Sequence, residues 1–163
     1  MNWREVCEDR SLADLPYKIE LDKRGKIVMS PAGKKHSKLQ SRLIRLFAHL
    51  MADGDALPEC AIETTAGTKV ADVAWISEKR WASMDPDDIS CVTAPEICIE
   101  ILSPANTLAE MLGTPEQPGK RELYFQAGAV EFWICDSQGR LSFYDRSGPL
   151  PKSKLCPEFP EKV

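Results

Sequence analysis

The sequence lacks the motifs of zinc-binding and membrane proteins. Its six cysteines include no C-x-x-C pair, and its two histidines, His36 and His49, fit no zinc-ligand spacing. No apolar run is long enough to cross a bilayer, and the first residues form no apolar signal region. We therefore expect a protein of the reducing cytoplasm, with free thiols and no membrane partner.

An excess of positive charge is also missing, because the formal net charge is −4. A nucleic-acid partner would then need a locally basic face, with the acidic residues elsewhere or neutralised by metal. The 163 residues suit one compact domain that needs no covalent staples. We expect its core to span about residues 17–145, followed by a poorly ordered, proline-rich tail at residues 146–163.

The first part of the chain predicts a hairpin followed by an amphipathic helix. Strand-like residues from Tyr17 to Met29 are interrupted by a turn at Asp22 to Gly25. From Lys34 to Met51 the apolar residues recur at helical spacing. The helix also carries a basic stripe: Lys34, Lys35, Lys38, Arg42 and Arg45. A solvated face is the usual explanation, although this stripe is also the best local candidate for phosphate contact.

Two acidic residues lie within otherwise apolar strand candidates. Val70 to Ile76 contains Asp72, and the nearly continuous apolar run Ile97 to Leu102 contains Glu100; Ile62 to Thr65 is a weaker strand. Ionised carboxylates buried in neighbouring strands would repel, so they need a cation or hydrogen-bond donors. A divalent metal would meet that need. Alternatively, one acid faces solvent at a strand end, and spacing alone does not decide between the two.

The second half predicts two short helices and two strands. The helices lie at Thr107 to Leu112 and at about Lys120 to Gln126, although Thr114 could cap the second one turn earlier. The strands lie at Val130 to Asp136 and Leu141 to Tyr144. This succession of strands and helices indicates a single α/β domain.

Several motifs together carry a family resemblance: Gly25 to Pro31 with His36, Val70 to Val73, Ile99 to Pro104, the series Lys120, Tyr124 and Gly128, and Glu131 to Asp136. On these residues the chain resembles the Uma-type restriction-endonuclease family, a branch of the PD-(D/E)XK nuclease superfamily. The resemblance covers nearly everything from Tyr17 to Tyr144. It implies a restriction-endonuclease-like fold, with a mixed central β-sheet flanked by helices.

The resemblance also implies a catalytic site made of Asp72, Glu100 and Lys120. The two acids and the backbone carbonyl of Ile101 would bind Mg²⁺, or Mn²⁺ as a substitute. The lysine that the superfamily usually has two positions after the second acid is absent, because Leu102 stands there. In the family a lysine of the following helix takes its place, and Lys120 fits that position. The ion would lower the pKa of a bound water for hydrolysis of DNA phosphodiesters, and Lys120 would orient that water.

Four further residues are accessory candidates. Glu20 and His36 match recurrent family positions, but exposure to solvent at the start of the helix is the better interpretation of His36. Gln40 lies one helical turn later and could contact substrate. Tyr124 shares a helix face with Lys120 and could contact the site, but a role in core packing is an equally good interpretation of this residue.

Two departures from the family pattern bear on activity. Ala71 replaces the proline that usually precedes the first acid, which should alter strand rigidity more than chemistry. Gly113 to Gly119 looks like an insertion between Glu100 and Lys120. If it displaces Lys120 by a few ångströms, the site would bind metal but be inert.

Three functional hypotheses follow. The first is a Mg²⁺-dependent endodeoxyribonuclease, acting as a homodimer because cutting a duplex takes two active centres. The second is a catalytically inactive module of the same fold that binds DNA or another protein. The third is a structural adaptor whose two strand acids face solvent.

Overall fold

The computed structural model describes residues 1–104 and 106–163. The helices are α1 (Trp3–Glu8), α2 (Lys34–Leu50), α3 (Glu78–Ala82), α4 (Leu108–Leu112) and α5 (Lys120–Gln126). The strands are β1 (Tyr17–Leu21), β2 (Ile27–Pro31), β3 (Gly54–Thr64), β4 (Gly67–Ser77), β5 (Ile97–Ile101), β6 (Glu131–Cys135), β7 (Leu141–Asp145) and β8 (Gly148–Leu150). None of the described helices combines the length and the apolar character needed to cross a membrane.

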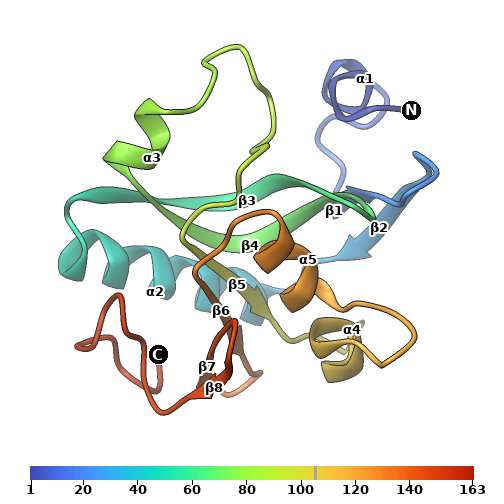
Figure 1. Ribbon diagram of the computed structural model, residues 1–163. Helices are drawn as coiled ribbons and strands as arrows, with labels where there is room; N and C mark the ends of the chain where they lie inside the picture. The colour runs from blue at the N-terminus through green and yellow to red at the C-terminus, as the bar shows by residue number, and fades with distance from the viewer. Residues whose placement is uncertain (105) are drawn as a thin grey trace.

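One mixed sheet of six strands organises the fold, in the order β3-β4-β5-β6-β7-β8 (Figure 1). β5 and β6 run parallel, whereas the other neighbouring pairs run antiparallel. A parallel pair needs a crossover connection, and α4 and α5 lie in that connection. The architecture confirms the predicted mixed central sheet flanked by helices.

Two helices cover opposite faces of the sheet. On one face, Leu43 and Phe47 of α2 are fully buried, and the Phe47 ring stacks on Trp133 of β6 at a centroid distance of 5.4 Å. On the other face, Tyr124 of α5 packs in a second cluster with Phe132. Because successive strand residues point to opposite faces, the adjacent Phe132 and Trp133 belong to different cores. α5 therefore has a fixed position over the sheet.

The β1–β2 hairpin lies beside β4 as a separate small sheet (Figure 1). Its turn includes Gly25 with a φ of 71°, a conformation that glycine adopts without steric cost. Glu20 accepts a hydrogen bond from the backbone N–H of Val70 at 2.9 Å. Lys69 donates to the carbonyl of Leu21 at 3.1 Å. These contacts fix the hairpin against β4, so that side chains of β1 reach the end of the central sheet.

Two local predictions were wrong. β3 spans 11 residues, whereas the sequence predicts only a weak strand at its end. Pro58 lies within β3, where it is tolerated because β3 is an edge strand. The alternative start of the last helix at Thr114 is also wrong. Thr114 instead closes a turn with Gln117, and α5 begins at Lys120 after Gly119.

The segment 146–163 was expected to be a poorly ordered tail, and the structure corrects this. β8 extends the central sheet beside β7. Phe159 is 4% exposed and packs on Phe47 and Trp133 at centroid distances of 4.8 Å each. The prolines prevent long regular elements in this segment, but they do not prevent the burial of its apolar side chains.

Glu131 holds the same segment to the sheet through a buried carboxylate that is 1% exposed. Its Oε2 accepts from the indole N–H of Trp133 at 2.7 Å and from the hydroxyl of Ser153 at 2.8 Å. Its Oε1 accepts from the backbone N–H groups of Lys154 at 2.7 Å and Leu155 at 3.0 Å. The four donors satisfy a charge that would otherwise be costly to bury.

Glu131→Ala should lower the free energy of unfolding by about 3–5 kcal/mol, because several buried donors would lose their acceptor at once. Urea unfolding followed by circular dichroism measures the change. Glu158→Ala, which removes an exposed carboxylate from the same segment, should change the free energy of unfolding by less than about 0.5 kcal/mol. Equal effects of the two substitutions would contradict the anchoring role of Glu131.

Candidate active site

Asp72 and Glu100 lie next to each other at the end of the β4–β5 ladder. The last paired residues of this ladder are Val73 and Ile99, and the two acids occupy the next opposing positions. Asp72 is 1% exposed and Glu100 is fully buried. The Oδ2 atom of Asp72 accepts from the backbone N–H of Ile101 at 2.7 Å, which holds the carboxylate at β5. Neither acid faces solvent, which removes the basis of the structural-adaptor hypothesis.

The ammonium of Lys18 bridges the two acids. Its Nζ lies 2.6 Å from Oδ1 of Asp72 and 3.2 Å from Oε2 of Glu100. Lys18 and Glu20 are two residues apart on β1, so strand alternation places both side chains on one face of the hairpin. Sequence analysis missed Lys18. Its position could have been inferred from Glu20, which matches a recurrent family position and lies two residues later on the same strand.

Lys120, the first residue of α5, reaches the same carboxylates. Its Nζ lies 2.6 Å from Oε1 of Glu20 and 3.1 Å from Oε1 of Glu100. The inserted segment does not displace it, because the segment closes on itself through a bridge between Gly113 and Pro118. The helix therefore starts beside the sheet end, with Lys120 in contact with the second acid.

Tyr124 lies one helical turn after Lys120 and is fully buried. Its hydroxyl donates to Oε1 of Glu100 at 2.7 Å. The residue thus packs in the core through its ring and contacts the site through its hydroxyl. Burial and the neighbouring carboxylate of Glu100 raise the pKa of Tyr124, so the hydroxyl keeps its proton and remains a donor.

The two acids differ in how well their charges are compensated. Burial and the charge of Glu100 raise the pKa of Asp72 to about 6, although Lys18 and His36 oppose the shift. Burial also raises the pKa of Glu100, but Lys120, Lys18 and the Tyr124 hydroxyl outweigh it, so the pKa of Glu100 is lowered overall. The buried charge of Glu100 is therefore better compensated than that of Asp72.

An open cleft of about 610 Å³ lies over the acids. The hairpin, α4 and the inserted segment contribute to its walls. Lys18, Lys69 and Lys120 all line it, together with Asp72 and His36. Glu100 is fully buried and does not line the cleft, but it contacts two of the lysines that do, Lys18 and Lys120. The lysines of this cleft can contact the phosphates of an anionic chain, and Glu20, Asp72 and Glu110 line it beside them.

His36 and Gln40 reach Asp72 from α2. The interpretation of His36 as a solvent-exposed helix residue was wrong: its side chain is 11% exposed, and its Nε2 lies 3.5 Å from Oδ1 of Asp72. The helix starts directly beside β4, which turns its first residues toward the site. Gln40 donates to the carbonyl of Asp72 at 2.7 Å and to Oε1 of Glu59 at 2.8 Å, so in this structure it supports the strand.

The basic stripe of α2 remains at the surface. Lys34, Lys35, Lys38 and Arg45 are exposed, and Arg42 is half-buried. The first of these residues immediately precede His36, which lines the cleft. The stripe is therefore solvated and also close to the cleft at its beginning.

The donor set around the acids suits a hard divalent cation. Asp72 and Glu100 offer carboxylate oxygens, and Ile101 offers a backbone carbonyl, to which the side chain of Asn106 donates a long hydrogen bond of 3.4 Å. The ammonium of Lys18 lies within 3.2 Å of both acids, so a single cation can contact both carboxylates at once. Mg²⁺ binds oxygen ligands and commonly uses one or two carboxylates, so the residues fit this ion.

Comparisons with known proteins agree with this architecture. The crystal structure of a "putative nuclease belonging to DUF820" from Anabaena variabilis ATCC 29413 is similar, with a TM-score of 0.70, 17% identity, and coverage of 88% of this chain and 86% of that chain. At this identity the likeness shows a shared fold. No curated protein matches the sequence. The family model Uma2, with the description "Putative restriction endonuclease", matches residues 9–150. The chain therefore belongs to the Uma2 family of restriction-endonuclease-like proteins.

Proposed function

We propose that this protein is a Mg²⁺-dependent endonuclease of the PD-(D/E)XK type that hydrolyses DNA phosphodiester bonds. The observation that carries the proposal is the convergence of Asp72, Glu100 and Lys120. Lys18 contacts both acids, and Lys120 lies 3.1 Å from Glu100. The nuclease descriptions of the family and of the similar crystal structure support the same class of activity.

Asp72, Glu100 and the carbonyl of Ile101 would hold the ion. When bound, the ion supplies Lewis-acid stabilisation of the reacting phosphate and lowers the pKa of the attacking water, and Mn²⁺ can substitute for Mg²⁺ in this role. Tyr124 keeps Glu100 oriented through its hydrogen bond of 2.7 Å. Lys18 would have to leave these carboxylates for the ion to be held there, because its ammonium contacts oxygens of both acids.

Lys120 is the residue that we expect to act on the reacting groups. Its side chain is 15% exposed at the cleft, and Glu20 and Glu100 hold its ammonium at 2.6 and 3.1 Å. From this position it can donate to a water molecule or to a phosphate oxygen and stabilise the developing negative charge. Glu20 acts as a positioning residue, because its carboxylate fixes the ammonium.

The cleft suits the backbone of DNA because lysines line it. The ammonium groups of Lys18 and Lys120 are paired with the acids of the site. Lys69 and the exposed Lys34 and Lys35 at the start of α2 supply positive charge at the cleft. This local charge allows an acidic chain, with a formal net charge of −4, to attract a polyanion. Cutting both strands of a duplex takes two such centres, so we propose a homodimer as the working form.

Lys120→Met should reduce Mg²⁺-dependent cleavage about 10²–10³-fold, the usual cost of losing one donor that stabilises developing charge. Mn²⁺ binding should persist, because Lys120 is not a metal ligand. The rate of nicking of supercoiled plasmid, with EDTA as the blank, measures the first effect, and calorimetric titration measures the second. Lys79→Met, an exposed lysine on α3, should cleave at the wild-type rate. Cleavage that persists unchanged in Lys120→Met would contradict the proposal.

One observation favours a catalytically inactive DNA-binding module instead. The ammonium of Lys18 contacts both acids, so their charges are partly neutralised without a metal. This alternative predicts a wild-type protein that retards DNA in a gel-shift assay but does not nick plasmid with Mg²⁺ or Mn²⁺. Metal-dependent nicking by the wild type excludes it.

A further inference from the structure

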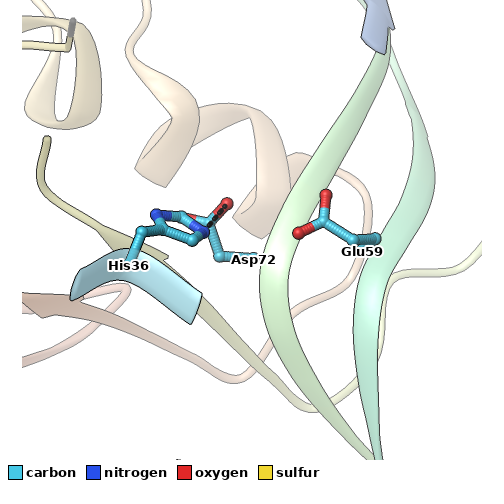
Figure 2. Close-up of side chains that lie close together, drawn as sticks. All are labelled: His36, Glu59 and Asp72. Atoms are coloured by element: carbon cyan, nitrogen blue, oxygen red, sulfur yellow. Dashed lines mark ion pairs between the residues drawn. The ribbon is translucent and has the colours of Figure 1, made fainter. Parts of the chain in front are cut away.

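A second group of metal-ligand side chains shares Asp72 but not Glu100. His36 comes from the first turn of α2, Glu59 from β3 and Asp72 from β4. One ligand atom of each lies within 4.8 Å of the other two. Figure 2 shows the imidazole of His36 and the carboxylate of Glu59 on either side of the Asp72 carboxylate, directed toward it. Three elements that are distant in sequence thus converge on one small volume.

The Nε2 atom of His36 is buried and, within the described chain, has no hydrogen-bond partner. It lies 3.5 Å from Oδ1 of Asp72, too far for a good hydrogen bond. A lone pair on Nε2 would face a carboxylate oxygen, which is unfavourable unless a proton or a metal ion lies between them. The buried nitrogen therefore points to an additional ligand.

Glu59 reaches this volume because β3 departs from regular strand geometry. Its φ is 49°, in the left-handed region that a residue other than glycine rarely adopts. The β3–β4 register passes from the pair Pro58 and Val73 to the pair Cys60 and Ala71, and skips Glu59. Strained backbone inside a strand is commonly retained at functional sites, where it aims a side chain.

Gln40 compensates for the interrupted ladder and orients the carboxylate of Glu59. Its Nε2 donates to the carbonyl of Asp72 at 2.7 Å, in place of a backbone donor from β3. The same Nε2 donates to Oε1 of Glu59 at 2.8 Å. Hydrogen bonds of this kind, made to ligands from behind, fix the orientation of metal-binding carboxylates. The strained backbone of β3 and the hydrogen bonds of Gln40 therefore both direct Glu59 toward Asp72.

We infer that His36, Glu59 and Asp72 bind a second divalent ion, of the transition-metal type such as Mn²⁺ or Zn²⁺. One imidazole nitrogen with two carboxylates suits these ions better than Mg²⁺, which takes oxygen ligands. The site shares Asp72 with the proposed Mg²⁺ site but uses neither Glu100 nor Ile101. It does not require that the protein cleave DNA.

Imidazole ¹⁵N NMR of the full-length chain with Zn²⁺ tests this site, because the sequence contains only two histidines. His49, exposed at the other end of α2, is the internal reference. Cys7, an exposed thiol, is replaced by serine in all samples so that it cannot take up Zn²⁺. One equivalent of Zn²⁺ should move the Nε2 resonance of His36 to the position of a metal-bound nitrogen and leave His49 unchanged.

Two substitutions sharpen the test. Glu59→Gln should weaken the Zn²⁺ affinity measured at His36 at least about tenfold, whereas Glu63→Gln, an exposed acid on the same strand, should leave it unchanged. An unaltered His36 resonance, or an equal response in Glu59→Gln, overturns the second site. A permanently protonated Nε2 that ignores Zn²⁺ overturns it as well and leaves a His36–Asp72 ion pair.

Glu100→Gln separates this inference from the proposed nuclease activity. The variant lacks a ligand of the proposed Mg²⁺ site, so its His36 resonance should still respond to Zn²⁺. If the His36 resonance responds to Zn²⁺ in a wild-type protein that never nicks DNA, the proposed nuclease activity is contradicted and the second metal site is not. Mg²⁺-dependent nicking without any His36 response would count against the second site alone.

Discussion

Glu100→Gln should lower the rate of metal-dependent cleavage by at least about 10³-fold, because Lewis-acid stabilisation is worth several kcal/mol and each 1.36 kcal/mol is tenfold in rate. Glu100 is fully buried and accepts hydrogen bonds from Lys18, Lys120 and Tyr124. An amide has a single oxygen and adds a donor, so it cannot accept from all three groups or supply the charge that a divalent ion requires.

Single-turnover cleavage of plasmid measures the rate, and calorimetric titration with Mn²⁺ should show weaker binding in the same variant. Circular dichroism checks that the variant is folded. Glu122→Gln is the matched control, because it makes the same change at an exposed position of α5, two residues after Lys120. Wild-type cleavage by Glu100→Gln would show that the buried acid does not serve the reaction.

Local sequence pattern predicted the parts of the fold whose period is clear. The leucines of α2 recur at helical spacing, and Ile97–Ile101 is a short apolar run with one acid, so both elements were found. β3 was underestimated because Pro58 and the left-handed Glu59 interrupt its alternation. Its length comes from pairing with β4, a tertiary contribution that outweighs local preference.

The two acids of the site could be predicted from the sequence, but Lys18, the lysine that bridges them, could not. Asp72 and Glu100 were conspicuous as charges in apolar strands. Lys18 looks like an ordinary lysine of a half-exposed strand, and its partners lie 54 and 82 residues away. Glu59 similarly resembles any acid of an edge strand until its backbone conformation is known. Such contacts depend on how the hairpin and β3 dock, which local pattern does not encode.

Lys18→Met should lower the free energy of unfolding of the metal-free protein by about 3–5 kcal/mol, the usual cost of removing one partner from a buried ion pair. The Lys18 side chain is 10% exposed. Burial lowers its pKa, but Glu100, Asp72 and Glu20 together raise the pKa overall, so its ammonium stays charged. Methionine resembles the lysine stem in length and apolar character, so loss of charge is the main change. Urea unfolding in EDTA measures the effect.

Mn²⁺ should restore much of this stability, because an ion between Asp72 and Glu100 would replace the missing ammonium. An ion at one hundred times its Kd adds about 2.7 kcal/mol, and Lys18→Met should bind it more tightly than the wild type, since no ammonium competes. Glu131→Ala provides the contrast, because its loss lies in the C-terminal contacts and Mn²⁺ should restore none of it. If Mn²⁺ stabilises Lys18→Met no more than the wild type, the two acids do not share an ion. In the wild type, Lys18 and Lys120 would then hold the two acids together without an ion, as the hypothesis of an inactive module requires.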